Sequence, residues 1–477
     1  MKILFIAAEA TPLVKVGGLA DVVGSLPKAL NGLGHEVRVM MPRHGIIDTA
    51  RFPATTVIDS LNVQVMQDTK AISLKITELP NKVKVYLVAS DEFFNSTEVY
   101  GKDEMKRFLL FCRAVVEILP GLDWQPEIVH CHDWHTALVP LWLKRNDYPY
   151  PSIFTIHNLA YQGAFDRSFL AASGLEQDWQ LLPTGAPAPA LNFMSQGILW
   201  ADLVTTVSET YAREILTPEY GAGLDHLLRY RREKLFGIVN GIDYEEYNPA
   251  TDPFIPAKYG ASTLKRRSTN KLALQKRAGF TENAAIPLIG MVSRLDEQKG
   301  LDILVGAFAS LFQKTRIQMV ILGRGREQYH NLLRQAASRY SQQLAVFIDF
   351  DDALAHLIYA GCDMFLMPSR FEPCGLGQFI AVRYGAVPVV RRTGGLTDTV
   401  QDLTQDISEG TGFVFQDYDS KALSTAVQRA IDAYKEKEAW QGVMRRIMAL
   451  DFSWQASAKK YQSLYQKVLG LRRYAKG

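Results

Sequence analysis

The chain has few cysteines and no long uninterrupted apolar stretch. Its 477 residues include only Cys112, Cys131, Cys362 and Cys374, which lie far apart and form no Cys-x-x-Cys pair. This spacing argues against a disulfide framework or a dithiol redox motif and favours free thiols. No apolar run approaches the roughly twenty residues that a membrane-spanning helix needs. Because the first residues lead directly into an apolar strand rather than a targeting region, we expect a cytoplasmic protein with no membrane partner.

A strong excess of one charge is also missing. The chain has 53 Lys and Arg against 50 Asp and Glu, which gives a net charge of +3. So small an excess does not indicate a nucleic-acid partner, and any anion site would have to come from local clustering. The length predicts about two or three domains.

Short apolar runs alternate with helical patterns along both halves of the chain. In the first half we predict strands at 3–8, 37–42, 83–88, 128–132 and 152–157, with short strands between 57 and 76. In the second half we predict strands at 287–292, 317–322, 345–350, 364–367 and 387–390. This alternation predicts an α/β fold with two doubly wound parallel sheets, whose ligands lie at the carboxyl ends of the strands. The two domains should join near residue 245.

A pair of glycines stands between the first strand and the first helical pattern. The sequence Lys15-Val16-Gly17-Gly18-Leu19-Ala20-Asp21 could be a tight turn with a solvated lysine. It could equally be an anion site, in which backbone N–H groups, a helix N-terminus and Lys15 face a phosphate. The later sequence Gly394-Gly395-Leu396-Thr397-Asp398 repeats the pattern, as matched sites or merely as matched turns.

Polar residues follow the strands at 128–132 and 152–157. The segment His130-Cys131-His132-Asp133-Trp134-His135 offers metal-ligating residue types, but no further cluster completes a tetrahedral set, so no metal is expected. His130 and His135 fit histidines held by backbone hydrogen bonds. Asp133 could be a helix N-cap or could orient a substrate hydroxyl. His157 ends the next strand in the same way, so it is either structural or part of a site.

The second half carries cations and a carboxylate at its strand ends. Arg294 and Lys299 belong either to a solvated loop or to a site that neutralises a departing diphosphate. Gly323 opens a weak Gly-x-Gly turn. Glu372 could bind sugar hydroxyls. Cys374 has no base spaced to activate it, which disfavours a thiol nucleophile.

These motifs give the chain a family resemblance. It resembles bacterial glycogen synthases and plant starch synthases, retaining glucosyltransferases with two Rossmann-like domains in the GT-B arrangement. The resemblance is carried in the family's order by residues 15–19, 132–135, 155–163, 204–208, 240–243, 293–300, 368–376, 391–396 and 451–454. It implies an acceptor-side domain at 1–245, a nucleotide-sugar domain at 246–450, a final helix at 451–477 that returns to the first domain, and a central cleft that closes on the substrates.

The resemblance also implies a reaction and its residues. We expect glucose transfer from ADP-glucose to the non-reducing end of an α-1,4-glucan, with retention and without metal or cofactor. The implied catalytic residues are Lys15, Asp133, His157, Arg294, Lys299 and Glu372. The implied substrate-binding residues are Gly17, Gly18, Asp21, Asn158, Gly323, Cys374, Gly375, Leu376, Thr393, Gly394 and Gly395. The oligomeric state stays open.

Several positions depart from the family pattern. They are Ser195-Gln196, Glu209, Arg326, Gly377 and Ile380. They affect the prediction of the donor nucleotide more than that of the reaction, because the residues assigned to the diphosphate are intact. A synthase that prefers UDP-glucose therefore stays open, as does a glucan-binding or regulatory protein without turnover.

Overall fold

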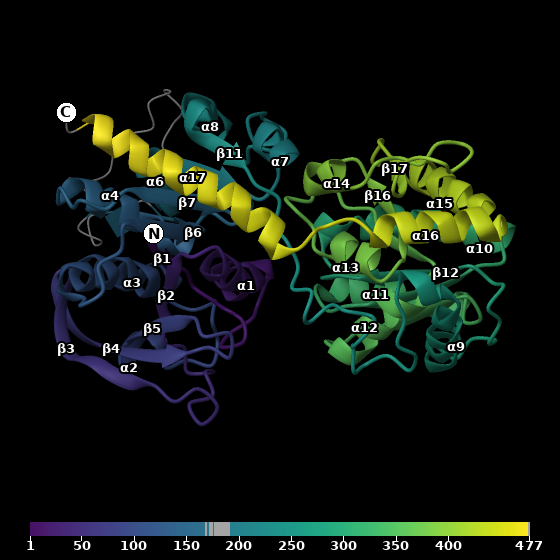
Figure 1. Cartoon of the computed structure of the whole chain (residues 1–477), viewed down its shortest axis with the longest axis horizontal. Coiled ribbons are helices and arrows are strands. Elements are labelled where there is room, and N and C mark those ends of the chain that lie inside the picture. Colours follow the sequence, from purple (N-terminus) through teal and green to yellow (C-terminus); the bar gives the residue numbers. More distant parts are fainter. Residues whose placement is uncertain (167–168, 171–174, 176–190, 476–477) are drawn as a thin grey trace. The chain divides into compact units, whose positions relative to one another are not determined.

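The chain forms two compact units. The structure, a computed structural model, describes residues 1–166, 169–170, 175 and 191–475. One unit comprises Met1–Gly241 together with Trp454–Gly477, and the other comprises Ile242–Ser453. Both are built from a sheet with helices on its two faces (Figure 1). The predicted α/β fold with two Rossmann-like domains is therefore confirmed.

The first unit is organised around a mostly parallel sheet. Among the described residues it has nine strands in the order β11-β10-β7-β6-β1-β2-β5-β4-β3. Their bounds are β1 Lys2–Ile6, β2 Glu36–Pro42, β3 Thr55–Val65, β4 Asp68–Glu78, β5 Lys84–Ala89, β6 Ile128–His132, β7 Ser152–Ile156, β10 Leu203–Thr206 and β11 Leu235–Gly237. Of these strands only β4 runs against the direction of the others, because it pairs antiparallel with both β3 and β5. Strands β1, β6 and β7 are almost wholly buried because helices cover both faces.

The helices of the first unit alternate with these strands. Their bounds are α1 Gly18–Gly32, α2 Asp91–Phe94, α3 Glu104–Ile118, α4 Leu138–Arg145, α6 Phe193–Trp200, α7 Glu209–Glu214, α8 Asp225–Tyr230 and α17 Trp454–Ala475. A further short hairpin pairs β8 Ala164–Phe165 with β9 Leu191–Asn192. The last helix, α17, packs on this unit beside α1, as the yellow helix in Figure 1 shows. Tyr461 and Tyr465 of α17 are fully buried in the same core cluster as Val22 and Leu26 of α1, which confirms the predicted return of the terminal helix.

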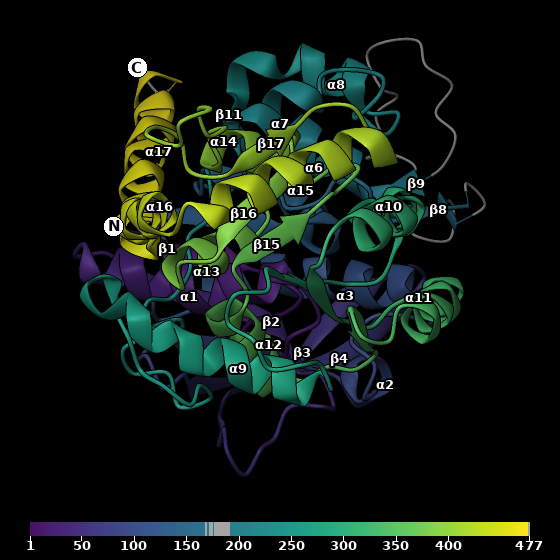
Figure 2. The ribbon, with the colours of Figure 1, turned by 90° about the vertical axis from the view of Figure 1, so that its right-hand side faces the viewer.

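The second unit has a fully parallel sheet, seen with its helices in Figure 2. In the part of the chain that the structure describes, it contains six strands in the order β14-β13-β12-β15-β16-β17. The strands are β12 Leu288–Val292, β13 Gln318–Leu322, β14 Leu344–Phe347, β15 Met364–Met367, β16 Val387–Arg391 and β17 Phe413–Phe415. The helices are α9 Arg267–Arg277, α10 Leu301–Lys314, α11 Glu327–Arg339, α12 Asp352–Gly361, α13 Gly377–Arg383, α14 Gly394–Thr399, α15 Ser420–Lys435 and α16 Lys437–Met448. Helix α12 contacts α9 and α13, whereas α10 contacts α11 and α15.

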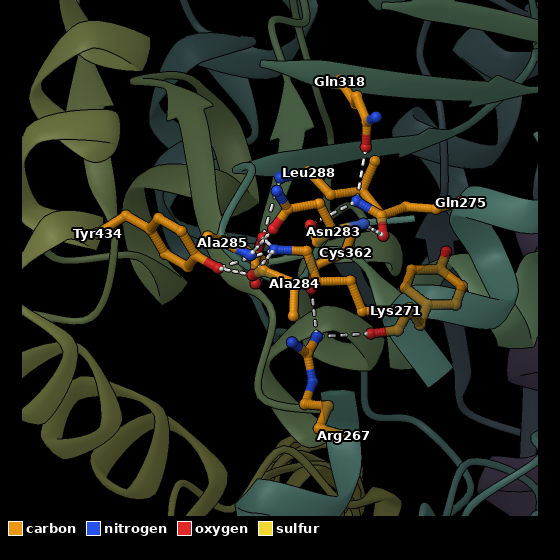
Figure 3. Close-up of polar contacts among 12 residues, drawn as sticks. Arg267, Lys271, Gln275, Asn283, Ala284, Ala285, Leu288, Gln318, Cys362 and Tyr434 are labelled. Carbon is orange, nitrogen blue, oxygen red and sulfur yellow. Dashed lines mark hydrogen bonds and ion pairs between the residues drawn. The ribbon is translucent and has the colours of Figure 1, made fainter. Parts of the chain in front are cut away.

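A buried polar network joins α9 to the rest of the second unit (Figure 3). The Nζ of Lys271 lies 2.6 Å from a carboxylate oxygen of Asp363 and donates to the Tyr434 hydroxyl at 2.7 Å. Arg267 donates to the Cys362 carbonyl one turn earlier on the helix. Lys271 and Asp363 are 3% and 6% exposed, so this ion pair belongs to the core.

Some sequence expectations differ from the structure in detail. The region predicted as short strands between 57 and 76 is a long antiparallel hairpin, β3 and β4. The strand predicted at 345–350 ends at Phe347, and Phe350 beyond it is 74% exposed. The first strand ends at Ile6 and α1 begins at Gly18, so an eleven-residue connection, 7–17, stands where a tight turn was one of the two alternatives. Among the described residues, no helix combines the length and the apolarity that crossing a membrane requires.

Candidate functional site

The connection from β1 to α1 carries the glycine motif. Gly17 is the N-cap of α1, Gly18 is its first residue and Asp21 lies in its first turn. The Nζ of Lys15 lies 2.8 Å from an Asp21 carboxylate oxygen, and both side chains are partly exposed. The predicted cation therefore lies at a helix N-terminus, already paired with the acid of the same motif.

A glutamate outside the predicted site residues, Glu9, holds this connection. Glu9 is 3% exposed, and its Oε2 accepts the N–H groups of Val16 at 2.6 Å and Gly17 at 3.1 Å. Its Oε1 accepts the Tyr100 hydroxyl at 2.9 Å. Burial raises the pKa of Glu9 despite these bonds. The Gly17 N–H, predicted to face an anion, is thus occupied by an anion of the protein itself. The one sequence signal was an isolated acid in the apolar run before the glycines.

Asp133 adopts an unusual backbone conformation at the end of β6. Its φ is 57° and its ψ is 177°, a combination that non-glycine residues rarely adopt and that marks stored strain. Its carboxylate accepts a hydrogen bond from the backbone N–H of His157 at 2.7 Å. Asp133 occupies the N-cap position of the helical turn Trp134–Thr136, which was one of its two predicted alternatives, but its side chain makes no capping bond there. Burial raises the pKa of Asp133 to about 7.

Three histidine rings close to Asp133 contact one another in the order His130, His132 and His157. His132 Nδ1 lies 3.0 Å from His157 Nε2, and the His130 and His132 ring centroids are 4.3 Å apart. His130 contacts the Tyr465 hydroxyl at 2.9 Å and the Thr155 hydroxyl at 2.6 Å. The expectation that backbone hydrogen bonds hold His130 is therefore wrong, because both ring nitrogens bond side chains. Burial lowers the pKa of His130 and His157 to about 3 and that of His132 well below its usual range.

His135 and Asn158 take more ordinary places beside these three histidines. His135 is buried against Tyr100, with ring centroids 4.8 Å apart. Its Nδ1 has no hydrogen-bond partner among the described groups, so a backbone bond of the expected kind does not hold this nitrogen. Asn158 is half-buried, and its side-chain oxygen accepts the Ala160 N–H at 3.0 Å.

In the second unit, the ends of β12 and β15 bring a cation and a carboxylate together. Lys299 Nζ lies 2.6 Å from Glu372 Oε2, although the two residues are 73 positions apart. The Ser369 hydroxyl donates to the same oxygen at 2.8 Å. Arg294 lies 3.2 Å from a carboxylate oxygen of Asp296 and is half-exposed. Glu372 is 4% exposed, so this is a built polar cluster rather than a solvated loop.

Glycines bring backbone close to these groups. Gly394 has a φ of +45°, and a Cβ there would lie 1.9 Å from the Glu372 carbonyl oxygen. The Gly395 N–H donates to that oxygen at 3.0 Å. The predicted echo between the two halves holds in one respect: each glycine pair opens a helix and donates an N–H to a glutamate, through the carboxylate of Glu9 or the carbonyl of Glu372.

The remaining predicted residues of the second unit surround the same strand ends. Gly323 follows β13, and a Cβ there would lie 1.9 Å from the Ser293 carbonyl oxygen. Thr393 is buried at the N-cap of α14, and Leu376 holds the N-cap of α13. Cys374 is buried and is not part of a disulfide within the described residues, and Gly375 has a φ of +75°. The predicted residues therefore form two groups, one in each unit. Within the described residues no three His, Cys, Asp or Glu side chains are grouped to hold a metal ion.

Comparison with known proteins places both halves in known sequence families. Residues 2–230 match the starch synthase catalytic domain, and residues 275–442 match the glycosyl transferases group 1. A glycogen synthase of Geotalea daltonii is 46% identical, with 98% of this chain and 99% of that protein aligned. A glycogen synthase of Thermotoga maritima is 44% identical over the same shares. This chain belongs to the glycogen and starch synthase family.

Solved structures agree with this assignment. The catalytic domain of starch synthase IV from Arabidopsis thaliana, bound to ADP and acarbose, has a TM-score of 0.89 and 34% identity, covering 98% of this chain and 99% of that one. Sucrose-phosphate synthase from Thermosynechococcus elongatus shares the fold, with a TM-score of 0.62 and 18% identity over 98% and 99% of the two chains. The predicted family and the GT-B class of fold are confirmed.

The departures from the synthase pattern have ordinary structural settings. Glu209 lies 3.5 Å from Lys460, and Arg326 lies 2.6 Å from Glu297. Ser195 lies in α6, where its N–H and hydroxyl bond the capping residue Asn192. Gly377 begins α13 and Ile380 is buried within it. These contacts do not involve Lys299 or Glu372.

Proposed function

We propose that this protein transfers glucose from ADP-glucose to the non-reducing end of an α-1,4-glucan, with retention of configuration at the anomeric carbon. The relatives named glycogen synthase and the starch synthase structure containing ADP support the donor and the reaction. The observation that carries the proposal is the contact of the half-buried Lys299 with the buried Glu372, which also accepts from the buried Ser369, with Arg294 nearby in sequence. A glucosyl transfer from a nucleotide sugar needs positive charge at the leaving diphosphate and an acceptor for sugar hydroxyls, and this cluster offers both.

Lys299 and Arg294 are assigned to the leaving nucleotide. When the bond between the anomeric carbon and the diphosphate oxygen breaks, negative charge accumulates on that oxygen. A fixed ammonium and a guanidinium stabilise this charge more in the transition state than in the ground state. Lys299 is held in place by Glu372, whereas Arg294 is half-exposed and can follow the ligand.

Glu372 is assigned to the hydroxyls of the donor glucose. Its bonds to Lys299 and Ser369 both involve Oε2, so Oε1 is oriented by them and can accept from a sugar hydroxyl. The backbone around Gly394 and Gly395 is packed against the Glu372 carbonyl, with Thr393 beside it. Cys374, Gly375 and Leu376 continue the chain past Glu372 and are assigned to the adjacent wall, and Gly323 is assigned to the nucleotide.

The first unit is assigned to the acceptor, the transferred sugar and part of the diphosphate. Lys15 is a mobile cation at a helix N-terminus, and a diphosphate would compete with Asp21 for it. Of the two glycines, Gly18 is the better amide donor, because Glu9 already accepts the Gly17 N–H. The backbone N–H of His157 donates to the Asp133 carboxylate, which holds the two residues side by side. Both residues, together with Asn158, are assigned to sugar hydroxyls. A cytoplasmic location remains a prediction.

A transfer assay tests the proposal. Purified protein is incubated with glycogen and either radiolabelled ADP-glucose or radiolabelled UDP-glucose, and label in the precipitated polymer is counted. We expect incorporation, with ADP-glucose the better donor. Faster incorporation from UDP-glucose would correct the donor alone. Glycogen binding without incorporation from either donor would replace the synthase with a glucan-binding protein. The cluster around Lys299 favours turnover over that second candidate.

A further inference from the structure

The side chain of His132 has no part in the function proposed above, yet it contacts the ring of His157. It comes from β6, is fully buried, and lies against the Phe5 ring, with centroids 4.8 Å apart. The Nδ1 of His132 and the Nε2 of His157 are 3.0 Å apart. The ring centroids are 5.2 Å apart and the planes differ by 30°. This centroid distance is close to the N···N distance plus the two ring radii, so the rings meet edge to edge through a hydrogen bond.

One proton must lie between these two nitrogens. Burial keeps both imidazoles neutral, because it lowers the pKa of each ring. A neutral imidazole carries one N–H and one lone pair, so one ring donates and the other accepts. Two arrangements are possible. If His157 donates from Nε2, the other proton of the pair is on His132 Nε2. If His132 donates from Nδ1, the other proton is on His157 Nδ1.

The surroundings of His132 Nε2 favour one of these two hydrogen-bond directions over the other. His132 Nε2 is buried and has no hydrogen-bond partner among the described groups. If His157 donated, His132 would carry its proton on Nε2 and bury an N–H with no acceptor. If His132 donates from Nδ1, its Nε2 is only an unpaired lone pair. Buried N–H groups without a partner are the rarer and more costly defect in folded proteins. The second arrangement is therefore favoured.

We infer that His132 is a positioning residue, which donates from Nδ1 to His157 Nε2 and so holds His157 in the tautomer that carries its proton on Nδ1. His157 then presents an N–H donor on its Nδ1 side. Because His157 is assigned to sugar hydroxyls, the kinetic part of this inference rests on the proposed function. The tautomer itself does not.

The tautomer can be read directly by nuclear magnetic resonance. The nine histidines are labelled with nitrogen-15, and long-range proton–nitrogen spectra distinguish protonated from unprotonated ring nitrogens. The His157 signals are assigned by their loss in His157→Gln. We expect a protonated Nδ1 and an unprotonated Nε2 for His157 in the wild type. A wild-type His157 protonated on Nε2 would overturn the inference.

Variants at His132 separate positioning from packing. Asparagine places its amide nitrogen near the position of Nδ1, so His132→Asn can still donate and should keep the tautomer. His132→Phe removes the donor while filling the space, so the His157 ring should become a mixture of its two neutral tautomers. We expect His132→Phe to lower kcat/KM about tenfold or more and His132→Asn to recover most of it. An unchanged His157 tautomer in His132→Phe, or equal kinetic losses in both variants, would reduce His132 to a packing residue.

A matched control lies two residues away. His130 is on the same strand, is equally buried and contacts the His132 ring, but its two ring nitrogens bond the hydroxyls of Tyr465 and Thr155 instead of His157. His130→Asn should disturb packing and leave the His157 tautomer unchanged. If the wild type transfers no glucose at all, the proposed function fails while the spectra still decide the tautomer. If His132→Phe does not fold, the wild-type and His132→Asn spectra decide it.

Discussion

The ammonium of Lys299 lies 2.6 Å from Glu372 Oε2, and the two side chains are 15% and 6% exposed. Lys299 precedes α10 and Glu372 precedes α13, so the fold of the second unit, not local sequence, brings them together. A buried pair of this kind contributes little net stability against an apolar replacement, whereas removal of one partner leaves an uncompensated charge. This asymmetry allows the structural and catalytic roles of Lys299 to be separated.

The first prediction concerns this pair. Lys299→Met should destabilise the second unit by about 3 kcal/mol, because Glu372 loses its counter-charge in a buried position. The double variant Lys299→Met, Glu372→Gln should regain most of that stability and still transfer little glucose, because no ammonium faces the leaving diphosphate. Urea unfolding and the polymer-labelling assay measure the two effects. Turnover close to wild type in the double variant would contradict the assigned role.

The second prediction concerns Glu9. Glu9→Leu removes the acceptor of the Val16 and Gly17 N–H groups and should lower kcat at least about tenfold, because the Lys15 connection is no longer held. Glu9→Gln should retain most activity, since its amide oxygen can accept both N–H groups while its amide nitrogen donates to Tyr100. Tyr100→Phe serves as the control that removes only the Oε1 bond. Equal rates in Glu9→Leu and wild type would show that the connection needs no such support.

Much of this fold follows from sequence pattern, for an identifiable reason. The parallel strands of both units are apolar runs buried on two faces, and runs such as 128–132 and 364–367 match the observed strands β6 and β15 residue for residue. The polar and half-exposed β3 and β4 lack this signal, so their length and antiparallel pairing could not be predicted.

The site residues likewise fall into those that could be predicted from the sequence and those that could not. Residues in short motifs, such as Lys15 and Lys299, could be named because charge, glycine and strand ends coincide locally. Glu9 and His132 could not, because their roles depend on partners 91 and 25 residues away, at Tyr100 and His157. The sequence shows which residue types lie at a strand end, but a hydrogen-bond partner from another strand is fixed only by the fold.

The third prediction is a pH dependence of stability. The folded-state pKa of Asp133 is about 7 and its ordinary value is 3.8, so between these values the folded protein keeps a proton that the unfolded chain releases. Stability should therefore fall as pH rises through this window. Asp133→Asn removes the titration, so its stability relative to wild type should increase on going from about pH 5 to about pH 8, by on the order of a few kcal/mol. The charge of Glu9 contributes to raising the pKa of Asp133, so the titration of Glu9 alters the size of this difference but not its direction. A difference that does not change with pH would contradict the raised pKa.

The fourth prediction concerns the glycine that packs on Glu372. Gly394→Ala should lower turnover sharply, because the new Cβ would meet the Glu372 carbonyl oxygen at 1.9 Å and the φ of +45° disfavours a side chain. Gly442→Ala is the matched control, since a Cβ there meets nothing within 4 Å and Gly442 lies inside helix α16. Kinetics and unfolding are measured for both. If Gly394→Ala kept wild-type kinetics, the position of Glu372 would not depend on this contact.

The fifth prediction contrasts the half-buried Lys299 with Lys271, a fully buried lysine of the same unit. Lys271 pairs with Asp363 at the same 2.6 Å, but within the core network of α9 (Figure 3). Lys271→Met should destabilise the second unit by about 3 kcal/mol and leave kcat per folded molecule unchanged, because no residue of this network is assigned to a substrate. Lys276→Met, on an exposed position of the same helix, should change stability by less than about 0.5 kcal/mol. Both ion pairs would then contribute to stability, but only the pair of Lys299 would contribute to turnover. A loss of kcat in folded Lys271→Met would show instead that the core network acts on the site.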